Sequence, residues 1–212
     1  MWSRRSTEAC RRTLAILLAA VLASGCASGP GAVPQEDPAA AAEQREVPPR
    51  VQTLYEQATA AMAAGENQDA ELRFREFLLQ HPEWPGAHVN LAILAVKKGD
   101  DLAAEAHIQS ALKIDPAHAA GLNQLGMLKR RQGLFEEAES AYLKAVTASP
   151  EYPLAHYNLG VLNELYLQRL DTALTHFERY LELGGQDEEV EKWVADLKRR
   201  IGASQRTANV TE

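Results

Sequence analysis

The sequence predicts an all-α fold, a right-handed α-solenoid of four helical hairpins closed by a C-terminal capping helix. The first observation is internal repetition with a period of 34 residues, which is typical of stacked helix–turn–helix units. The second is an amphipathic stretch after the last unit, with the length of one further helix. Together they predict repeats at 51–84, 85–118, 119–152 and 153–186, and a capping helix at 187–201.

Four kinds of residue recur at the 34-residue step, and each has a structural reason. A glycine ends the first helix, where a positive φ is needed, and a small alanine lets two helices approach closely. An aromatic residue or Ile fills the wedge between hairpins, and a proline follows the second helix, which it cannot continue. The recurring positions are Gly65, Gly99 and Gly133; Ala70, Ala104 and Ala138; Phe74, Ile108 and Tyr142; and Pro82, Pro116 and Pro150.

Residues 51–186 resemble the tetratricopeptide repeat family. In the third repeat the family's pattern is present as Leu122, Leu125, Gly126, Gly133, Ala138, Tyr142, Ala145 and Pro150. The resemblance implies that the first helix of each hairpin lines a concave groove, and such solenoids commonly bind extended peptides on this face. It therefore implies a protein-binding function and a protein or peptide partner.

The fourth repeat departs from the pattern of the other three. Ala173 and Phe177 arrive one residue late, and no glycine occupies the turn. The segment 164–169 must therefore either lengthen the first helix or widen the turn. Tyr180 replaces the second small alanine, so we expect different packing there.

The predicted capping helix has its apolar residues at i, i+3, i+4, i+7 and i+11, which forms one stripe along a helix. Its acidic start and basic end complement the helix dipole. We expect it to cover the open face of the fourth hairpin, and we expect a disordered tail at 202–212. The stripe consists of Val190, Trp193, Val194, Leu197 and Ile201.

Candidate binding residues follow from the resemblance, because the family places groove residues at the second, fifth, sixth, ninth, twelfth and thirteenth positions of a repeat. The fifth and sixth positions supply the candidates. Asn and Gln amides suit a peptide backbone, since each offers donors and an acceptor, and Tyr supplies apolar area with a polar tip. The alternative is that the Asn side chains only bond neighbouring helices. No fifth position holds Lys, so no carboxylate clamp is predicted. The candidates are Tyr55, Asn90, Asn123, Gln124, Tyr157 and Asn158.

The first 25 residues predict a signal peptide, with arginines before an apolar segment at 14–22. The stretch LASGC at 22–26 resembles the bacterial lipoprotein processing box, although the preferred Leu lies four residues before Cys26 instead of three. The resemblance implies removal of 1–25 and acylation of Cys26, with palmitate among its acyl chains. The alternative is an ordinary signal peptide.

Residues 26–50 predict a flexible tether, because prolines and glycines there disfavour regular structure. Ala27 stands where Asp marks retention in the inner membrane of enteric-type lipoproteins. The absence of Asp at this position resembles the outer-membrane class of lipoproteins. We therefore expect a cell-envelope protein, lipid-anchored at the periplasmic face of the outer membrane.

Charge and motifs exclude several functions. The chain has 22 basic and 29 acidic residues, a net charge of −7, which argues against a nucleic-acid partner. Phosphate-loop, dinucleotide, His-Glu-x-x-His and Gly-x-Ser-x-Gly motifs are missing from the sequence, so we expect neither an enzyme nor a cofactor. His88 and His156 lie two periods apart, in non-adjacent hairpins, so no metal site is expected from that pair.

The leading hypothesis is a membrane-anchored periplasmic scaffold or adaptor. The stretches 176–182 and 192–200 resemble small tetratricopeptide proteins encoded beside TonB–ExbB–ExbD systems. One alternative is a lipoprotein for type IV pilus assembly, and another is an adaptor for peptidoglycan hydrolases.

Overall fold

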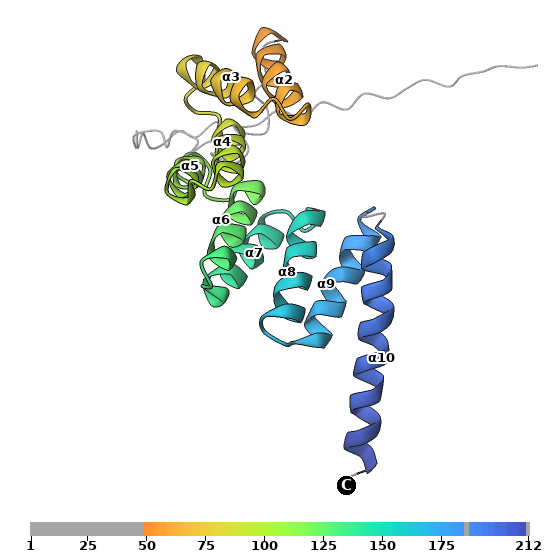
Figure 1. Cartoon of the computed structure of the whole chain (residues 1–212). Coiled ribbons are helices and arrows are strands. Elements are labelled where there is room, and N and C mark those ends of the chain that lie inside the picture. Colours follow the sequence, from red (N-terminus) through yellow and green to blue (C-terminus); the bar gives the residue numbers. More distant parts are fainter. Residues whose placement is uncertain (1–48, 185–186, 211–212) are drawn as a thin grey trace, which may run out of the picture. The chain divides into compact units, whose positions relative to one another are not determined.

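A computed structural model describes residues 49–184 and 187–210, and every regular element in these ranges is an α-helix (Figure 1). Eight of the helices form four hairpins and a ninth follows them, so the predicted fold class is confirmed. The helices are α2 (Pro49–Ala63), α3 (Asn67–Gln80), α4 (Pro85–Lys98), α5 (Asp101–Ile114), α6 (Ala119–Arg131), α7 (Phe135–Ala148), α8 (Pro153–Leu165), α9 (Leu170–Glu182) and α10 (Glu188–Val210).

The turns inside the first three hairpins depend on glycine. Gly65, Gly99 and Gly133 have φ between 78° and 80°, a left-handed conformation that a side chain disfavours. Between hairpins, each recurring proline lies two residues beyond the end of the second helix, as at Pro116 after α5. Proline also starts first helices, because Pro85 and Pro153 need no amide hydrogen at that position.

Within each hairpin, a small residue of the first helix lies against a large residue of the second. A Cβ added to Gly126 would lie 2.4 Å from the Tyr142 ring, and one added to Gly160 would lie 2.5 Å from the Phe177 ring. Ala58 and Ala92 hold the equivalent positions in the first two hairpins and are fully buried. The predicted alanines and wedge residues are buried as well. They are Ala70, Ala104, Ala138 and Ala173, with Phe74, Ile108, Tyr142 and Phe177.

The fourth hairpin places its extra residue in the turn. Helix α8 has 13 residues, the same as α6, so it is not lengthened. The turn spans 166–169, and Gln168 takes a left-handed φ of 54° in the absence of a glycine. Tyr180 packs against Tyr157, with 5.3 Å between ring centroids, and joins the apolar cluster shared with α10. Its packing therefore differs from that of the alanine it replaces, as expected.

Helix α10 covers the end of the stack and is longer than predicted. Val190 and Leu197 are fully buried in the cluster with Phe177, which confirms the capping stripe. The prediction of a disordered tail at 202–212 is wrong for residues 202–210, because the helix continues to Val210. The extension contains Ala and Gln and no proline, and adding residues to an existing helix costs far less than starting one.

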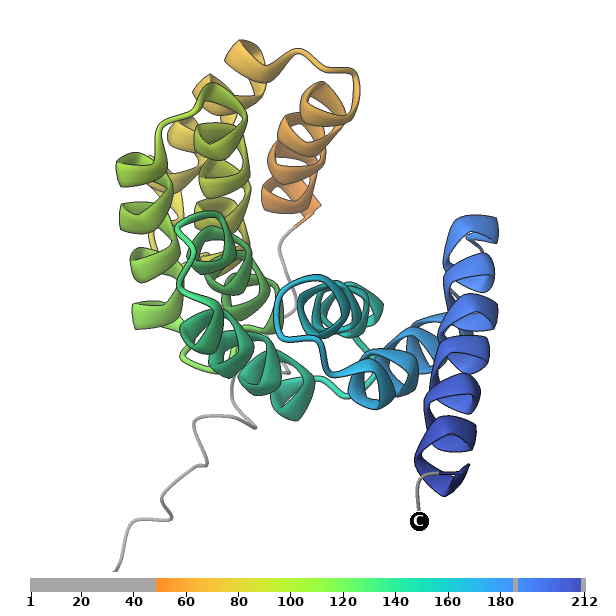
Figure 2. The same cartoon turned by 60° about the horizontal axis from the view of Figure 1, so that its bottom comes forward.

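The hairpins stack through two sets of contacts (Figure 2). Each second helix packs on the first helix of the next hairpin, as α3 does on α4, α5 on α6 and α7 on α8. The first helices also touch one another, α4 with α6 and α6 with α8. The predicted groove residues therefore lie on neighbouring helices.

The predicted signal peptide, Cys26 and nearly all of the tether at 26–50 lie outside the described residues. Helix α2 begins at Pro49, inside the last two residues of the range expected for the tether. Among the residues that the structure describes, none of the helices is long and apolar enough to span a bilayer.

Candidate peptide-binding groove

All six predicted binding residues lie on the first helices, and two hydrogen bonds join four of them across hairpins. Asn90 Nδ2 donates to Tyr55 Oη over 2.8 Å, and Asn158 Nδ2 donates to Asn123 Oδ1 over 2.9 Å. Each bond links the fifth position of one repeat to the sixth position of the next, 35 residues away. These two positions therefore form a repeated polar contact between first helices.

The Asn123–Asn158 bond is buried and structural. Asn123 is 1% exposed and Asn158 is 6% exposed. The expectation that these two amides face a peptide is therefore corrected, since the structure uses them to join α6 to α8. A buried amide must find a hydrogen-bond partner, and the neighbouring helix offers one at the equivalent position.

Gln124 lies between the second and third hairpins, at the joint between α4 and α6 where this polar contact is missing. Its counterpart at the fifth position of the second repeat is Val89, which has no group to donate or accept a hydrogen bond. Gln124 is half-buried and makes no side-chain hydrogen bond within the described ranges. Among the predicted Asn and Gln side chains, it is therefore the one whose amide is not bonded to another side chain.

The two predicted tyrosines belong to aromatic clusters at opposite ends of the stack. Tyr55 lies with its ring centroid 5.4 Å from Phe77 and 6.2 Å from Trp84. Burial raises the pKa of the Tyr55 phenol, although the bond with Asn90 lowers it in part. Tyr157 packs against Tyr180 and the α10 residue Trp193. Both tyrosines are half-buried, so only part of each ring is offered to a ligand.

Arg130 is a candidate that sequence reasoning did not select, although it occupies the twelfth position, one of the family's groove positions. Its Nη1 atom and the Tyr142 hydroxyl are both buried and lack hydrogen-bond partners in the described part of the chain. Burial raises the pKa of Tyr142 to about 12, so its hydroxyl stays protonated, while the nearby Arg130 charge acts in the opposite direction. The charge of Arg130 also lowers the pKa of Tyr157 in part, against a net rise caused by burial. Unsatisfied donors beside an unpaired cation favour an anionic acceptor.

Two histidine pairs were also missed. His88 and His107 have their Nδ1 atoms 3.4 Å apart, and His156 and His176 have theirs 3.1 Å apart. As predicted, His88 and His156 occupy the same place in separate hairpins, but each faces a histidine of the second helix. His107 and His176 are 69 residues apart, which is two periods plus the one-residue shift of the fourth repeat. Allowing for this one-residue shift in the sequence would have shown that His107 and His176 occupy equivalent positions in their hairpins.

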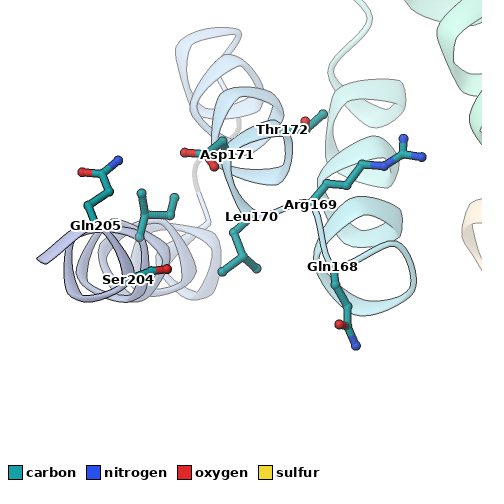
Figure 3. A pocket seen from close by; sticks show the side chains of 8 residues that line it. Gln168, Arg169, Leu170, Asp171, Thr172, Ser204 and Gln205 are labelled. Carbon is teal, nitrogen blue, oxygen red and sulfur yellow. The ribbon is translucent and has the colours of Figure 1, made fainter. Parts of the chain in front are cut away.

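An open hollow lies between α9 and α10 (Figure 3). The figure shows Leu170 extending towards α10, while Gln168 and Arg169 point away from it. Arg169 instead bonds to Glu139 of α7 over 2.7 Å. The hollow thus combines two apolar side chains, Leu170 and Ile201, with scattered polar groups, and it contains none of the predicted binding residues.

Repeated hairpins with joined first helices define the chain as a helical-repeat protein of the class suited to binding proteins or peptides. The family model described as tetratricopeptide repeat matches residues 55–119 and 123–188, more than half of the chain, and the chain belongs to this family. Comparison with curated proteins gives no match.

Solved structures agree with this assignment. The structure of Pseudomonas aeruginosa pilF is 26% identical, with a TM-score of 0.63 over 74% of this chain and 72% of that chain. The thermophilic repeat protein TTC0263 of Thermus thermophilus is 21% identical, with a TM-score of 0.60 over 76% of this chain and 86% of that one. The first repeat domain of Spaghetti (RPAP3), bound to an HSP90 peptide, is 21% identical, with a TM-score of 0.52 over 56% of this chain and 95% of that one. The last two establish the fold alone.

Proposed function

We propose that this chain is a scaffold that binds an extended segment of a partner protein on its inner face. The inner face is the partly exposed surface of α4, α6 and α8 around Gln124, Arg130 and Tyr157. The observation that carries the proposal is the free amide of Gln124 at the joint where Val89 replaces a hydrogen-bonding residue. An amide held there suits the alternating donors and acceptors of a peptide backbone.

The partner segment is expected to carry an acidic residue. Arg130 forms no ion pair with any carboxylate that the structure describes, and its Nη1 atom is buried without an acceptor. The Tyr142 hydroxyl, close enough to be influenced by this charge, also lacks an acceptor. A partner carboxylate would pair with the charge of the half-buried Arg130 side chain through charge-assisted hydrogen bonds, whereas the fully buried Tyr142 hydroxyl lies out of its reach.

A photo-crosslinking experiment tests the binding face. A photoreactive amino acid replaces either Gln124 on α6 or Gln109, an exposed residue of the second helix α5. Irradiation in cells is expected to give a defined crosslinked partner from position 124 and a much weaker one from position 109. The proposal fails if the same partner crosslinks equally from both positions, or only from position 109.

The scaffold is proposed to be held at the periplasmic face of the outer membrane by acyl chains on Cys26. The support is the signal-like segment and processing box at 1–26, and several acyl chains on one residue give durable anchoring. A Cys26→Ser protein is expected to leave the membrane fraction and lose palmitate labelling. Membrane fractionation unchanged from the wild type would contradict the anchor.

Two envelope complexes are candidates for the partner. The resemblance of 176–182 and 192–200 supports a TonB–ExbB–ExbD system. The similarity to Pseudomonas aeruginosa pilF supports the second candidate, pilus assembly. Identification of the protein crosslinked at position 124 separates them, because an ExbB, ExbD or TonB adduct supports the first and a pilus-assembly adduct supports the second. The third alternative, an adaptor for peptidoglycan hydrolases, predicts a hydrolase adduct.

A further inference from the structure

We propose that His156 and His176 bind a divalent transition-metal ion through their two Nδ1 atoms. The pair joins α8 to α9, and the two Nδ1 atoms are 3.1 Å apart. Two imidazole nitrogens bound to one tetrahedral Zn²⁺ would lie about 3.3–3.4 Å apart, and two at right angles would lie about 2.9 Å apart. The observed separation falls between these values, so an ion needs only a small movement of the rings.

A backbone contact holds His156 in the tautomer that such a site requires. His156 Nε2 lies 3.1 Å from the carbonyl oxygen of Pro150. A carbonyl only accepts, so His156 carries its proton on Nε2 and presents a lone pair on Nδ1. Metal-bound histidines commonly have this outer-shell arrangement. Without an ion, His176 donates its Nδ1 proton to that lone pair; with an ion, His176 carries its proton on Nε2.

The surroundings define what kind of ion fits. The rings border an open hollow of about 400 Å³, which gives an ion access from solvent. Glu178 and Glu182 also border it, but both are ion-paired, and the pairing of Glu182 with Arg179 at 3.1 Å offsets the charge of that guanidinium. No group of three or more potential ligands occurs in the described part of the chain. Two imidazoles and water therefore make up the shell, which favours Ni²⁺, Cu²⁺ or Zn²⁺ over Mg²⁺ or Ca²⁺.

The equivalent pair in the second hairpin provides an internal comparison. His88 and His107 have Nδ1 atoms 3.4 Å apart, a separation that also fits two metal ligands. Neither ring shows a backbone contact like that of His156 within the described residues. Because its tautomers are not fixed in advance, this pair is expected to bind the ion more weakly.

Calorimetric titration with Zn²⁺ and with Cu²⁺ tests the site. The full chain is used without an affinity tag and with Cys10→Ser and Cys26→Ser, since thiolates bind zinc. His156→Ala and His176→Gln are each expected to lower the affinity of the tighter step by more than about tenfold. His81→Ala is the matched control, because the His81 ring packs on Phe77 and makes no hydrogen bond to either pair in the described ranges, so its loss should leave the titration unchanged.

A second readout separates loss of ligand from loss of fold. Circular dichroism checks that each variant is folded, and nitrogen NMR of the histidine rings follows the Nδ1 signals during titration. The proposal expects the Nδ1 signals of His156 and His176 to move first. It is overturned if the folded His176→Gln protein titrates like the wild type, if those two signals stay in place, or if only His88→Ala removes the tighter step.

Discussion

At the scale of single residues, the small positions on the first helices set how closely each hairpin closes. The glycine that the repeat pattern places at Gly126 has no room for a methyl group, because the fully buried Tyr142 ring fills that space. The ring is held on all sides, so it cannot move away at little cost. The glycine in the repeat pattern therefore reflects the lack of space for any side chain at this position.

Gly126→Ala is predicted to destabilise the fold by about 1–3 kcal/mol, the usual cost of overpacking a core. The added Cβ would lie 2.4 Å from a Tyr142 ring carbon. Gly202→Ala in α10 is the control, because a Cβ there meets no atom within 4 Å. It should raise helix stability by up to roughly 1 kcal/mol. Urea unfolding measures both, and a Gly126→Ala protein as stable as the wild type would contradict the packing.

The buried amide pair gives a second prediction at this scale. Asn123→Ala or Asn158→Ala leaves one buried amide without its partner, which costs about 1–3 kcal/mol. The double variant Asn123→Ala/Asn158→Ala removes both amides and should cost less than the sum of the single changes. A double-mutant cycle by chemical denaturation measures the coupling. Strictly additive effects would show that the bond does not join the two helices.

At the scale of elements, the turn of the fourth hairpin is the irregular part of the repeat. The late arrival of Ala173 and Phe177 predicts an extra residue, but sequence alone leaves two ways to place it. The structure widens the turn and puts Gln168 at a positive φ. The choice depends on the packing of α8 against α9, a contact between distant residues that local sequence does not encode.

Gln168→Gly is predicted to stabilise the protein by up to about 1 kcal/mol, because it relieves a left-handed φ of 54°. Gln132→Gly is the matched control in the turn of the third hairpin, where φ is −79°. That change should be neutral or destabilising, since it only adds freedom to the unfolded chain. Thermal unfolding compares them, and equal shifts in melting temperature would argue against strain at Gln168.

The histidine pair of the fourth hairpin makes stability depend on pH. Burial lowers the pKa of His176 from 6.5 to about 4, with the nearby His156 acting in the same direction, and burial also lowers the pKa of His156. The unfolded chain therefore takes up protons first. The stabilising contribution is complete above about pH 6.5 and is lost as the pH falls towards 4.

The melting temperature of the wild type should consequently fall more steeply over this window than that of His156→Asn/His176→Asn. The comparison cancels the acid response of carboxylates such as Glu71, whose pKa is lowered mainly by the hydrogen bond from Lys98. Parallel curves for the two proteins would show that the pair does not titrate as described.

At the scale of the whole described solenoid, the architecture follows from the sequence, whereas the proposed binding surface depends on the contacts between neighbouring hairpins. The 34-residue step predicts the hairpins and the stripe ending at Ile201 predicts the cap. The identity of a residue does not show whether an Asn side chain faces a ligand or a neighbouring helix. The role of Asn123 therefore became clear only from the structure. The buried Nη1 atom of Arg130, which has no hydrogen-bond partner in the described ranges, likewise results from three-dimensional packing and could not be predicted from the sequence.

A partner segment is proposed to lie on the inner face, and the decisive measurement is the affinity of that partner for paired variants of the chain. The partner identified by crosslinking is titrated against the wild type, Gln124→Ala and Gln109→Ala. Loss of one hydrogen bond of about 0.5–1.5 kcal/mol predicts an affinity roughly two- to tenfold weaker for Gln124→Ala. Gln109→Ala should bind like the wild type. Undiminished binding by Gln124→Ala, or an equal loss in both variants, would contradict the account.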